Sequence, residues 1–299
     1  VVEHPHRTMR ALGERFDALQ SFTDANKRAA GDLFERCGVT WWADEKERPA
    51  LEESLRALRA RGVAAEAREG QGPFPFGLHL PDDGQLVPDA HARLVERARS
   101  AGATLQEQAF ARLDDDDRVW SGPTAYEPEL IVLAAGAGCG ALDARLTGAV
   151  LPVRDVAVAV PGQARGFHRS GQGWISWRQE ADQLAISGAR WATPHLEVDE
   201  PEPVADPRVV ARLGDQLERR GLPREGTVRA WITAQSRDQL PLVGPLPGQP
   251  RRIVATGFGV NPATFSFAAA DAVVRGILHG ERDLPRLVST SRLVHWRLG

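Results

Sequence analysis

The chain has 299 residues, of which 42% are hydrophobic and 26% charged, and its formal net charge is −3. A chain of this length can bury a full core and is expected to form two domains. The net charge excludes a global basic field for nucleic acid, and no apolar run approaches the ~20 residues of a membrane helix. The first ten residues lack the apolar segment of a signal peptide, and two cysteines favour free thiols in the cytoplasm over a disulfide framework.

Five helices are predicted from apolar residues that recur at intervals of three or four. They cover about residues 8–36, 50–61, 88–101, 207–220 and 262–279. The last helix has the clearest ends, because Asn261-Pro262 supplies an N-cap followed by proline at the first helical position, and Gly280 follows its final turn.

Two kinds of strand are predicted. Residues 130–135 are a continuous apolar run ending in glycines, which is typical of a strand buried on both faces of a parallel sheet. Residues 252–256 are a second strand of this kind. The short segments 156–160, 173–178 and 184–191 alternate in part and are separated by turn residues, which favours an antiparallel sheet.

These elements predict an α/β fold with two interleaved domains. An α/β domain is expected to comprise residues 1–30, 86–150 and 233–299, and a β-rich domain residues 31–85 and 151–232. We see no internal repeat, and no histidine, cysteine and acidic residues with the spacing of a metal site.

The first glycine motif directly follows the strand at 130–135. Residues 136–141 read Gly-Ala-Gly-Cys-Gly-Ala and fit the dinucleotide-binding pattern G-x-G-x-x-G/A. The stretch after it, 142–150, is too short for the crossover helix of such a unit. Asp155, at nearly the distance of a ribose-binding acid, is expected to lie before its strand. A glycine turn leaving a sheet is therefore favoured over a complete dinucleotide site.

The second motif is the C-terminal loop 236–248, followed by a strand and by Gly257-Phe258-Gly259 at the entry to the last helix. The N-terminus of a helix offers free N–H groups and a partial positive charge, which stabilise negative charge on a ligand. Taken alone, proline- and glycine-rich loops of this type are usually turns.

The order of these motifs resembles the D-amino-acid oxidase family of flavoproteins, which includes glycine and sarcosine oxidases. The matching pieces are "IVLAAGAG", "LPVR", "SRDQLPLVGPLPG" and "IVATGFG", in this order over about residues 86–280. The resemblance implies an FAD-binding Rossmann-like domain of the glutathione-reductase type, interleaved with a substrate domain built on a mixed, mainly antiparallel sheet. The segment from Glu3 to His6 is also similar to the oxidase domain of the bacterial enzyme that modifies wobble uridine in tRNA.

The resemblance also implies where FAD and substrate would bind. The cofactor positions are His4, His6, Ala135, Gly136, Pro152, Gly244, Gly257, Phe258, Gly259, Asn261 and Thr264. The substrate positions are Trp174, Arg229, Trp231, Thr233 and Arg237. Core packing is the more frequent explanation of a tryptophan such as Trp174. Arg237 is most simply the ion-pair partner of Asp238, and Arg190 is interpreted as a surface residue. No catalytic acid or base stands out.

Two departures from the family pattern bear on function. The family's first strand and its G-x-G-x-x-G motif have no counterpart in this sequence, and Thr233 stands where amino-acid oxidases carry a carboxylate-binding arginine. We therefore expect FAD-dependent oxidation of a C–N bond in a small amine or amino acid by hydride transfer to flavin. The alternative is a cofactor-free, repurposed relative that acts as a binding or partner subunit. A homodimer or a complementing subunit would then cover the incomplete sheet.

Overall fold

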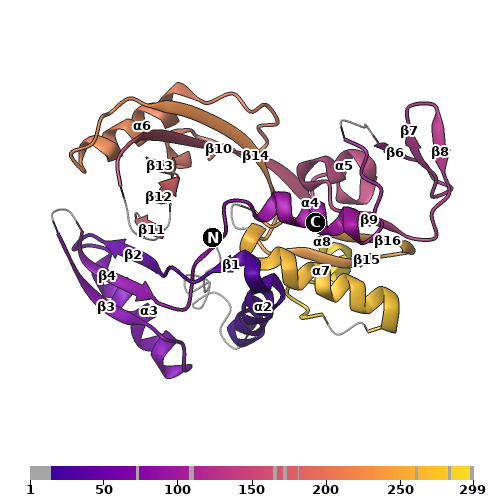
Figure 1. Ribbon diagram of the computed structural model, residues 1–299, viewed down its shortest axis with the longest axis horizontal. Helices are drawn as coiled ribbons and strands as arrows, with labels where there is room; N and C mark the ends of the chain where they lie inside the picture. The colour runs from indigo at the N-terminus through magenta and orange to yellow at the C-terminus, as the bar shows by residue number, and fades with distance from the viewer. Residues whose placement is uncertain are drawn as a thin grey trace. The chain divides into compact units, whose positions relative to one another are not determined.

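The computed structural model describes residues 15–71, 74–107, 111–163, 167–170, 174–180, 182–259, 262–281 and 284–296. The chain folds into two compact units, each built from separate stretches of sequence (Figure 1). Unit 1 comprises Val1–Asp24, Glu35–Gln85 and Pro152–Thr233, and unit 2 comprises Ala25–Phe34, Leu86–Leu151 and Ala234–Gly299.

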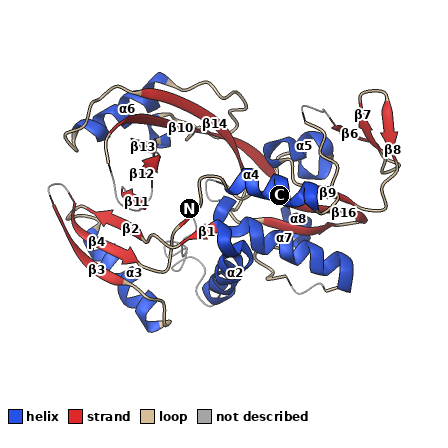
Figure 2. Ribbon diagram, viewed as in Figure 1, coloured by secondary structure: helices blue, strands red, loops and turns tan. Residues whose placement is uncertain are grey.

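Unit 1 is built on an eight-stranded sheet in the order β14-β10-β13-β12-β11-β2-β4-β3 (Figure 2). The strands are β2 (Val39–Ala43), β3 (Glu66–Gln71), β4 (Phe74–Leu80), β10 (Val150–Pro161), β11 (Phe167–Ser170), β12 (Ile175–Glu180), β13 (Gln183–Gly188) and β14 (Thr227–Ser236). Strand β2 runs parallel to β11, whereas the pairs β10–β13, β12–β13, β11–β12, β2–β4 and β3–β4 are antiparallel. The predicted mixed, mainly antiparallel sheet is confirmed.

Two helices cover opposite faces of this sheet. Helix α3 (Arg48–Ala60) packs Leu51, Leu55 and Leu58 on one face, in a core with β2 and β4. Helix α6 (Pro207–Glu218) packs on alternate residues of β10, namely Val156, Val158 and Val160. The strand register assigns the two cores to opposite faces, because successive side chains of a strand point to opposite sides. The face opposite α6 therefore carries Asp155 and Ala157.

Unit 2 contains a three-stranded sheet in the order β15-β16-β9. Strand β9 (Ile131–Leu133) is parallel to β16 (Gln249–Thr256), and β15 (Leu242–Leu246) is antiparallel to β16. Helix α7 (Pro262–His279) packs on β15 and β16. A separate three-stranded meander is formed by β6 (Ala111–Leu113), β7 (Val119–Ser121) and β8 (Thr124–Tyr126).

The remaining elements are short or connect the units. Helix α2 (Arg15–Ala30) and the 3-10 turn η2 (Gly31–Leu33) precede β1 (Phe34–Glu35), which pairs with β5 (Gln85–Leu86). Unit 2 also contains α4 (Ala90–Ser100), η3 (Gly136–Gly138), α5 (Cys139–Leu142), η4 (Ala144–Leu146), η7 (Thr290–Arg292) and α8 (Leu293–Trp296), and unit 1 contains η6 (Arg190–Ala192). No helix in the described part of the chain combines the length and apolar character needed to cross a membrane.

Three expectations from the sequence need correction. The first helix ends at Ala30 rather than near residue 36, because Gly31 adopts a positive φ of 55°. Strand β9 is not buried on both faces: Val132 is 47% exposed, since β9 is an edge strand of the described sheet and α7 packs on the other two strands. Asp155 lies inside β10 rather than before it.

Candidate functional site

Two glycine turns lie at the carboxyl ends of the parallel strands of unit 2. Gly136, which follows β9, has a φ of 58°, and Gly257 and Gly259, which follow β16, have φ values of 74° and 59°. The Thr256 hydroxyl donates a hydrogen bond of 3.0 Å to the Gly136 carbonyl and so joins the two turns. Ligands of α/β proteins bind at this end of a parallel sheet.

The space beside two of these glycines is open. Among the described residues, a Cβ atom on Gly136 would meet only the Ala234 side chain, at 3.8 Å, and one on Gly259 only the Gln235 side chain, at 3.9 Å. The turns therefore leave room for a ligand to approach the backbone closely, which is a use of glycine that a larger residue would block. Gly244 is different: its Cβ would lie 3.3 Å from Leu284, so packing within the protein explains it.

A buried amide fixes the first turns of α7 beside this edge. The Asn26 side chain, fully buried, donates 2.7 Å to the Ala263 carbonyl and accepts 2.8 Å from the Phe267 amide. An ideal helix would pair these two backbone groups with each other. Asn26 is thus inserted between successive turns of α7, near the end where Thr264 is buried.

Replacing Asn26 by leucine, which has a similar shape, is expected to lower the free energy of unfolding by about 1–3 kcal/mol, because buried groups of α7 lose their partner. Thr23→Val is the matched control, since Thr23 is equally buried but bonds only the Leu19 carbonyl of its own helix. Urea unfolding measures both variants. An equal effect of the two substitutions would show that Asn26 has no special role in α7.

The loop after β14 is held by a different arginine from the one expected. Asp238 forms an ion pair of 2.8 Å with Arg292, not with Arg237. The Arg237 side chain is exposed, and its backbone amide donates 3.1 Å to the Ala149 carbonyl. The Ser236 hydroxyl bonds both Asp238 and the Leu240 carbonyl. The adjacent Arg237 points to solvent, whereas an arginine 54 positions away closes the loop.

Three expected substrate residues occupy alternate positions on β14 and so share one of its faces. Arg229 forms an ion pair with Glu180, and the Thr233 hydroxyl donates 3.1 Å to the Val153 carbonyl. Trp231 is 37% exposed. Arg229 and Thr233 therefore already have protein partners, which weakens the case for either as a substrate anchor.

The other expected positions are distributed between the units. Ala135, Gly136, Gly244, Gly257, Phe258, Gly259 and Thr264 belong to unit 2, and Phe258 forms a β-bridge with Gln235. Pro152 and Trp174 belong to unit 1, where the Pro152 carbonyl accepts 2.8 Å from the Asp199 amide. His4, His6 and Asn261 lie outside the described residues.

Two charged residues of unit 1 were not among the site residues predicted from the sequence. Arg190, expected at the surface, has a side chain only 14% exposed, and its Nε atom lies 3.8 Å from the Asp155 carboxylate. Asp155 is itself 5% exposed. The guanidinium of Arg190 also covers the ring of Trp174, at 5.6 Å from its centroid.

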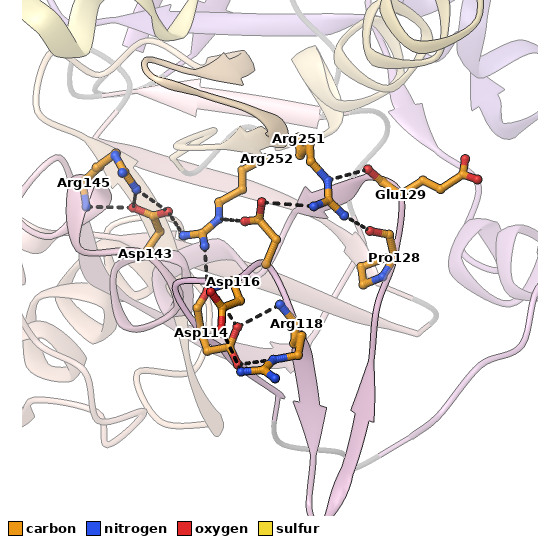
Figure 3. Close-up of polar contacts among 10 residues, drawn as sticks. Asp114, Asp116, Arg118, Pro128, Glu129, Asp143, Arg145, Arg251 and Arg252 are labelled. Atoms are coloured by element: carbon orange, nitrogen blue, oxygen red, sulfur yellow. Dashed lines mark hydrogen bonds and ion pairs between the residues drawn. The ribbon is translucent and has the colours of Figure 1, made fainter.

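A second cluster that the sequence did not reveal is a buried ion network in unit 2 (Figure 3). Arg252 of β16 pairs with Asp117 at 2.5 Å and with Asp143 at 2.8 Å, and it donates 2.7 Å to the Asp114 carbonyl. Burial raises the pKa of Asp143, but the bonds from Arg252 and Arg145 outweigh it, so the net shift is downward. All three guanidinium nitrogens of Arg252 bond protein oxygens, so we interpret the network as a link between β16 and the meander rather than a ligand site.

The sequence matches the family described as FAD dependent oxidoreductase over residues 4–275. A search of curated protein sequences finds no match.

Similar solved structures include L-proline dehydrogenase from P. horikoshii, with a TM-score of 0.77 and 15% identity over 94% of this chain and 83% of that one. Glycine oxidase from Geobacillus kaustophilus has a TM-score of 0.69 and 20% identity over 90% and 77% of the two chains. Iminodiacetate oxidase from Chelativorans sp. BNC1 has a TM-score of 0.67 and 15% identity over 90% and 80%. At these identities the likeness concerns the fold. Similarity to the tRNA-modifying enzyme is not among these findings.

Proposed function

Because the chain belongs to the family of FAD-dependent oxidoreductases, we propose that it oxidises a carbon–nitrogen bond of a small amine or amino acid. In this reaction the carbon next to nitrogen loses a hydride, and the resulting imine is hydrolysed. FAD, when bound, supplies the hydride acceptor. The contribution of the protein is to bind, orient and shield the reacting groups.

The observation that carries the proposal is the pair of glycine turns joined by Thr256. Both turns follow parallel strands and both have positive φ, and among the described residues a Cβ atom on Gly136 or Gly259 would meet no protein atom closer than 3.8 Å. The nearby α7 has 18 residues, and its first turn contributes a partial positive charge. These residues fit one wall of a flavin site: backbone amides and the helix end would face an electron-rich edge of the cofactor.

FAD uptake tests this assignment. The protein is incubated with FAD and passed over a gel-filtration column, and the visible flavin absorbance of the eluted protein is recorded. We expect flavin to remain bound to the protein. Gly259→Ala is expected to weaken binding about tenfold or more, equivalent to ~1.4 kcal/mol, because the new methyl group occupies the cofactor's space.

Gly248→Ala is the matched control for this test. Gly248 has a similar φ of 77°, and a Cβ atom there would meet nothing within 4 Å. Its strain in the left-handed region should be comparable, whereas FAD affinity should stay unchanged. Equal loss of FAD binding in both variants would attribute the effect to backbone strain and contradict the assignment of Gly259.

A specific observation favours a second candidate function. In the described sheet of unit 2, β9 has a neighbour only on the β16 side, and Val132 is half exposed. Helix α7 also exposes Val274, Ile277 and Leu278. The alternative is that the chain is a cofactor-free relative whose sheet edge accepts a strand from a second polypeptide. A purified chain that takes up no FAD would contradict the first proposal and favour this one.

A further inference from the structure

Unit 2 contains a small cavity of about 120 Å³ away from the glycine turns. Its lining, among the described residues, comprises Arg145 of η4, Pro247 of the β15–β16 turn, and Leu293 and Val294 of α8. Pro247 precedes β16 at its amino end, whereas two of the glycine turns follow its carboxyl end. The 8 residues of this strand span roughly 25 Å, so the cavity is separate from the edge assigned to the flavin.

Three of the four lining residues are apolar. Leu293 is 3% exposed and belongs to the same core cluster as Leu146 and Val254, so this part of the wall is held by the core. The next residue, Val294, is 51% exposed, and the cavity is therefore open to solvent beside it. Pro247 adds an apolar ring. A ligand can thus enter from solvent and bury an apolar group against Leu293.

Arg145 supplies the charge of this lining. Its Nη1 atom bonds both carboxylate oxygens of Asp143, at 3.2 Å, and Asp143 lies between Arg145 and Arg252 (Figure 3). Within the described part of the chain, the Nε and Nη2 groups of Arg145 donate to no acceptor. A guanidinium has five N–H donors in a planar fork, and only two of them belong to Nη1. The remaining donors are available to a ligand.

The ion pairs beside the cavity carry an excess of positive charge. Arg145 and Arg252 share the Asp143 carboxylate. Arg252 and Arg251 share that of Asp117. Three guanidinium groups thus face two carboxylates in this series of ion pairs. An anion at Arg145 would balance the excess, and a carboxylate matches the geometry of a guanidinium.

The volume of the cavity limits the ligand to a few heavy atoms. Apolar protein cavities of about 150 Å³ bind benzene, so a somewhat smaller one suits a ligand of about five or six non-hydrogen atoms. Propionate and butyrate have this size. Each joins a carboxylate, which Arg145 can bind, to a short alkyl chain that suits the apolar wall.

We propose that this cavity binds a short-chain carboxylate of about three or four carbons. The carboxylate accepts hydrogen bonds from the Nε and Nη2 groups of Arg145, and the alkyl chain packs on Leu293, Pro247 and Val294. The site is distinct from the place of the proposed C–N oxidation and does not depend on that reaction.

Titration of the full-length chain with butyrate tests the proposal, with saturation-transfer NMR as the readout and ionic strength held constant. Acetate retains the charge but lacks most of the alkyl chain, whereas butan-1-ol retains the chain but lacks the charge. We expect butyrate to bind about tenfold more tightly than either, because only butyrate uses both the arginine and the apolar wall. Added FAD should leave the affinity for butyrate unchanged.

Variants of the cavity locate the binding, since a site for amino acids would also accept a carboxylate. Arg145→Gln should weaken butyrate binding about tenfold or more and remove the preference over butan-1-ol. Arg145→Lys should retain part of the affinity. Val294→Trp should abolish binding by filling the cavity, although it leaves the charge of Arg145 in place.

Each variant has a matched control. Arg208 repeats the local arrangement of Arg145, because its side chain and its amide both bond an aspartate two positions earlier, Asp206. Arg208→Gln should therefore bind butyrate like the wild type. Val204, 66% exposed, lies in unit 1, so Val204→Trp should also bind normally. Circular dichroism and thermal unfolding verify that each variant is folded.

Four results would overturn the proposal. They are equal affinity for butyrate and butan-1-ol, wild-type affinity in Arg145→Gln, an equal loss of affinity in Arg145→Gln and Arg208→Gln, and displacement of butyrate by FAD. If Arg145→Gln does not fold, the comparison of Val294→Trp with Val204→Trp decides in its place. Equal affinity of these two tryptophan variants for butyrate would place the ligand outside the cavity.

Discussion

Replacing Arg252 by methionine is expected to lower the free energy of unfolding by about 3 kcal/mol, because two buried carboxylates lose their closest guanidinium. The Arg252 side chain is 5% exposed, and those of Asp143 and Asp117 are 1% and 12% exposed. Without Arg252, and among the described residues, Asp143 retains only Arg145, at 3.2 Å, and Asp117 retains only the longer contact with Arg251, in surroundings that solvate charge poorly. Guanidinium chloride unfolding, monitored by circular dichroism, measures the loss.

The neighbouring arginine provides the control for this prediction. Arg251 is 48% exposed, bonds the Pro128 and Glu129 carbonyls, and lies 3.7 Å from Asp117. Arg251→Met should therefore lower the free energy of unfolding by less than about 1 kcal/mol. Adding Asp143→Asn to Arg252→Met should restore part of the loss, because one stranded charge is removed. Similar losses for Arg251→Met and Arg252→Met would contradict the assignment of the network to Arg252.

Substituting alanine for Gly188 is expected to lower the free energy of unfolding by about 3 kcal/mol or more. The new methyl group would collide with the Trp174 carbonyl, and the positive φ at this position strains any residue other than glycine. The methyl carbon would lie 2.0 Å from that backbone oxygen, so the turn itself has to move. Thermal unfolding measures the loss.

Gly221→Ala separates conformational strain from steric contact. Gly221 has a φ of 71°, and a Cβ atom on it would meet nothing within 4 Å. Gly221→Ala should therefore lower the free energy of unfolding by only about 1–2 kcal/mol, the strain of a left-handed backbone at a residue other than glycine. If Gly188→Ala costs no more than Gly221→Ala, the close approach of β13 to Trp174 is not a constraint on the fold.

Patterns of apolar residues predicted most of the longer helices of this fold and some of its strands. The helices α3, α4, α6 and α7 lie close to their predicted ranges, because each has a continuous apolar stripe and a glycine or proline near its end. Short alternating segments predicted an antiparallel sheet in unit 1, and the family resemblance implied its mixed character. The prediction that the strand at 130–135 is buried on both faces was wrong. An apolar run does not reveal whether its strand has neighbouring strands on one side or on both.

The site was harder to predict because its key contacts join residues distant in sequence. Asp155 and Arg190 lie 35 positions apart and meet only through the β10–β13 pairing. The sequence shows Asp155 only at nearly the distance of a ribose-binding acid from a glycine motif, and it favours a surface position for Arg190. Asn26 and Ala263, 237 positions apart, illustrate the same limit. The glycine turns were predicted because their signal is local.

The central claim is that this chain oxidises a C–N bond through FAD, and anaerobic reduction tests it most directly. The FAD-loaded protein is mixed, in the absence of oxygen, with glycine, L-alanine, D-alanine, L-proline, methylamine, ethylamine and pyrrolidine in turn, and the visible flavin absorbance is followed. The account predicts that at least one amino acid bleaches the flavin, with one equivalent of carbonyl product released per flavin. Flavin that stays oxidised with every compound, in protein that has bound FAD, would contradict it.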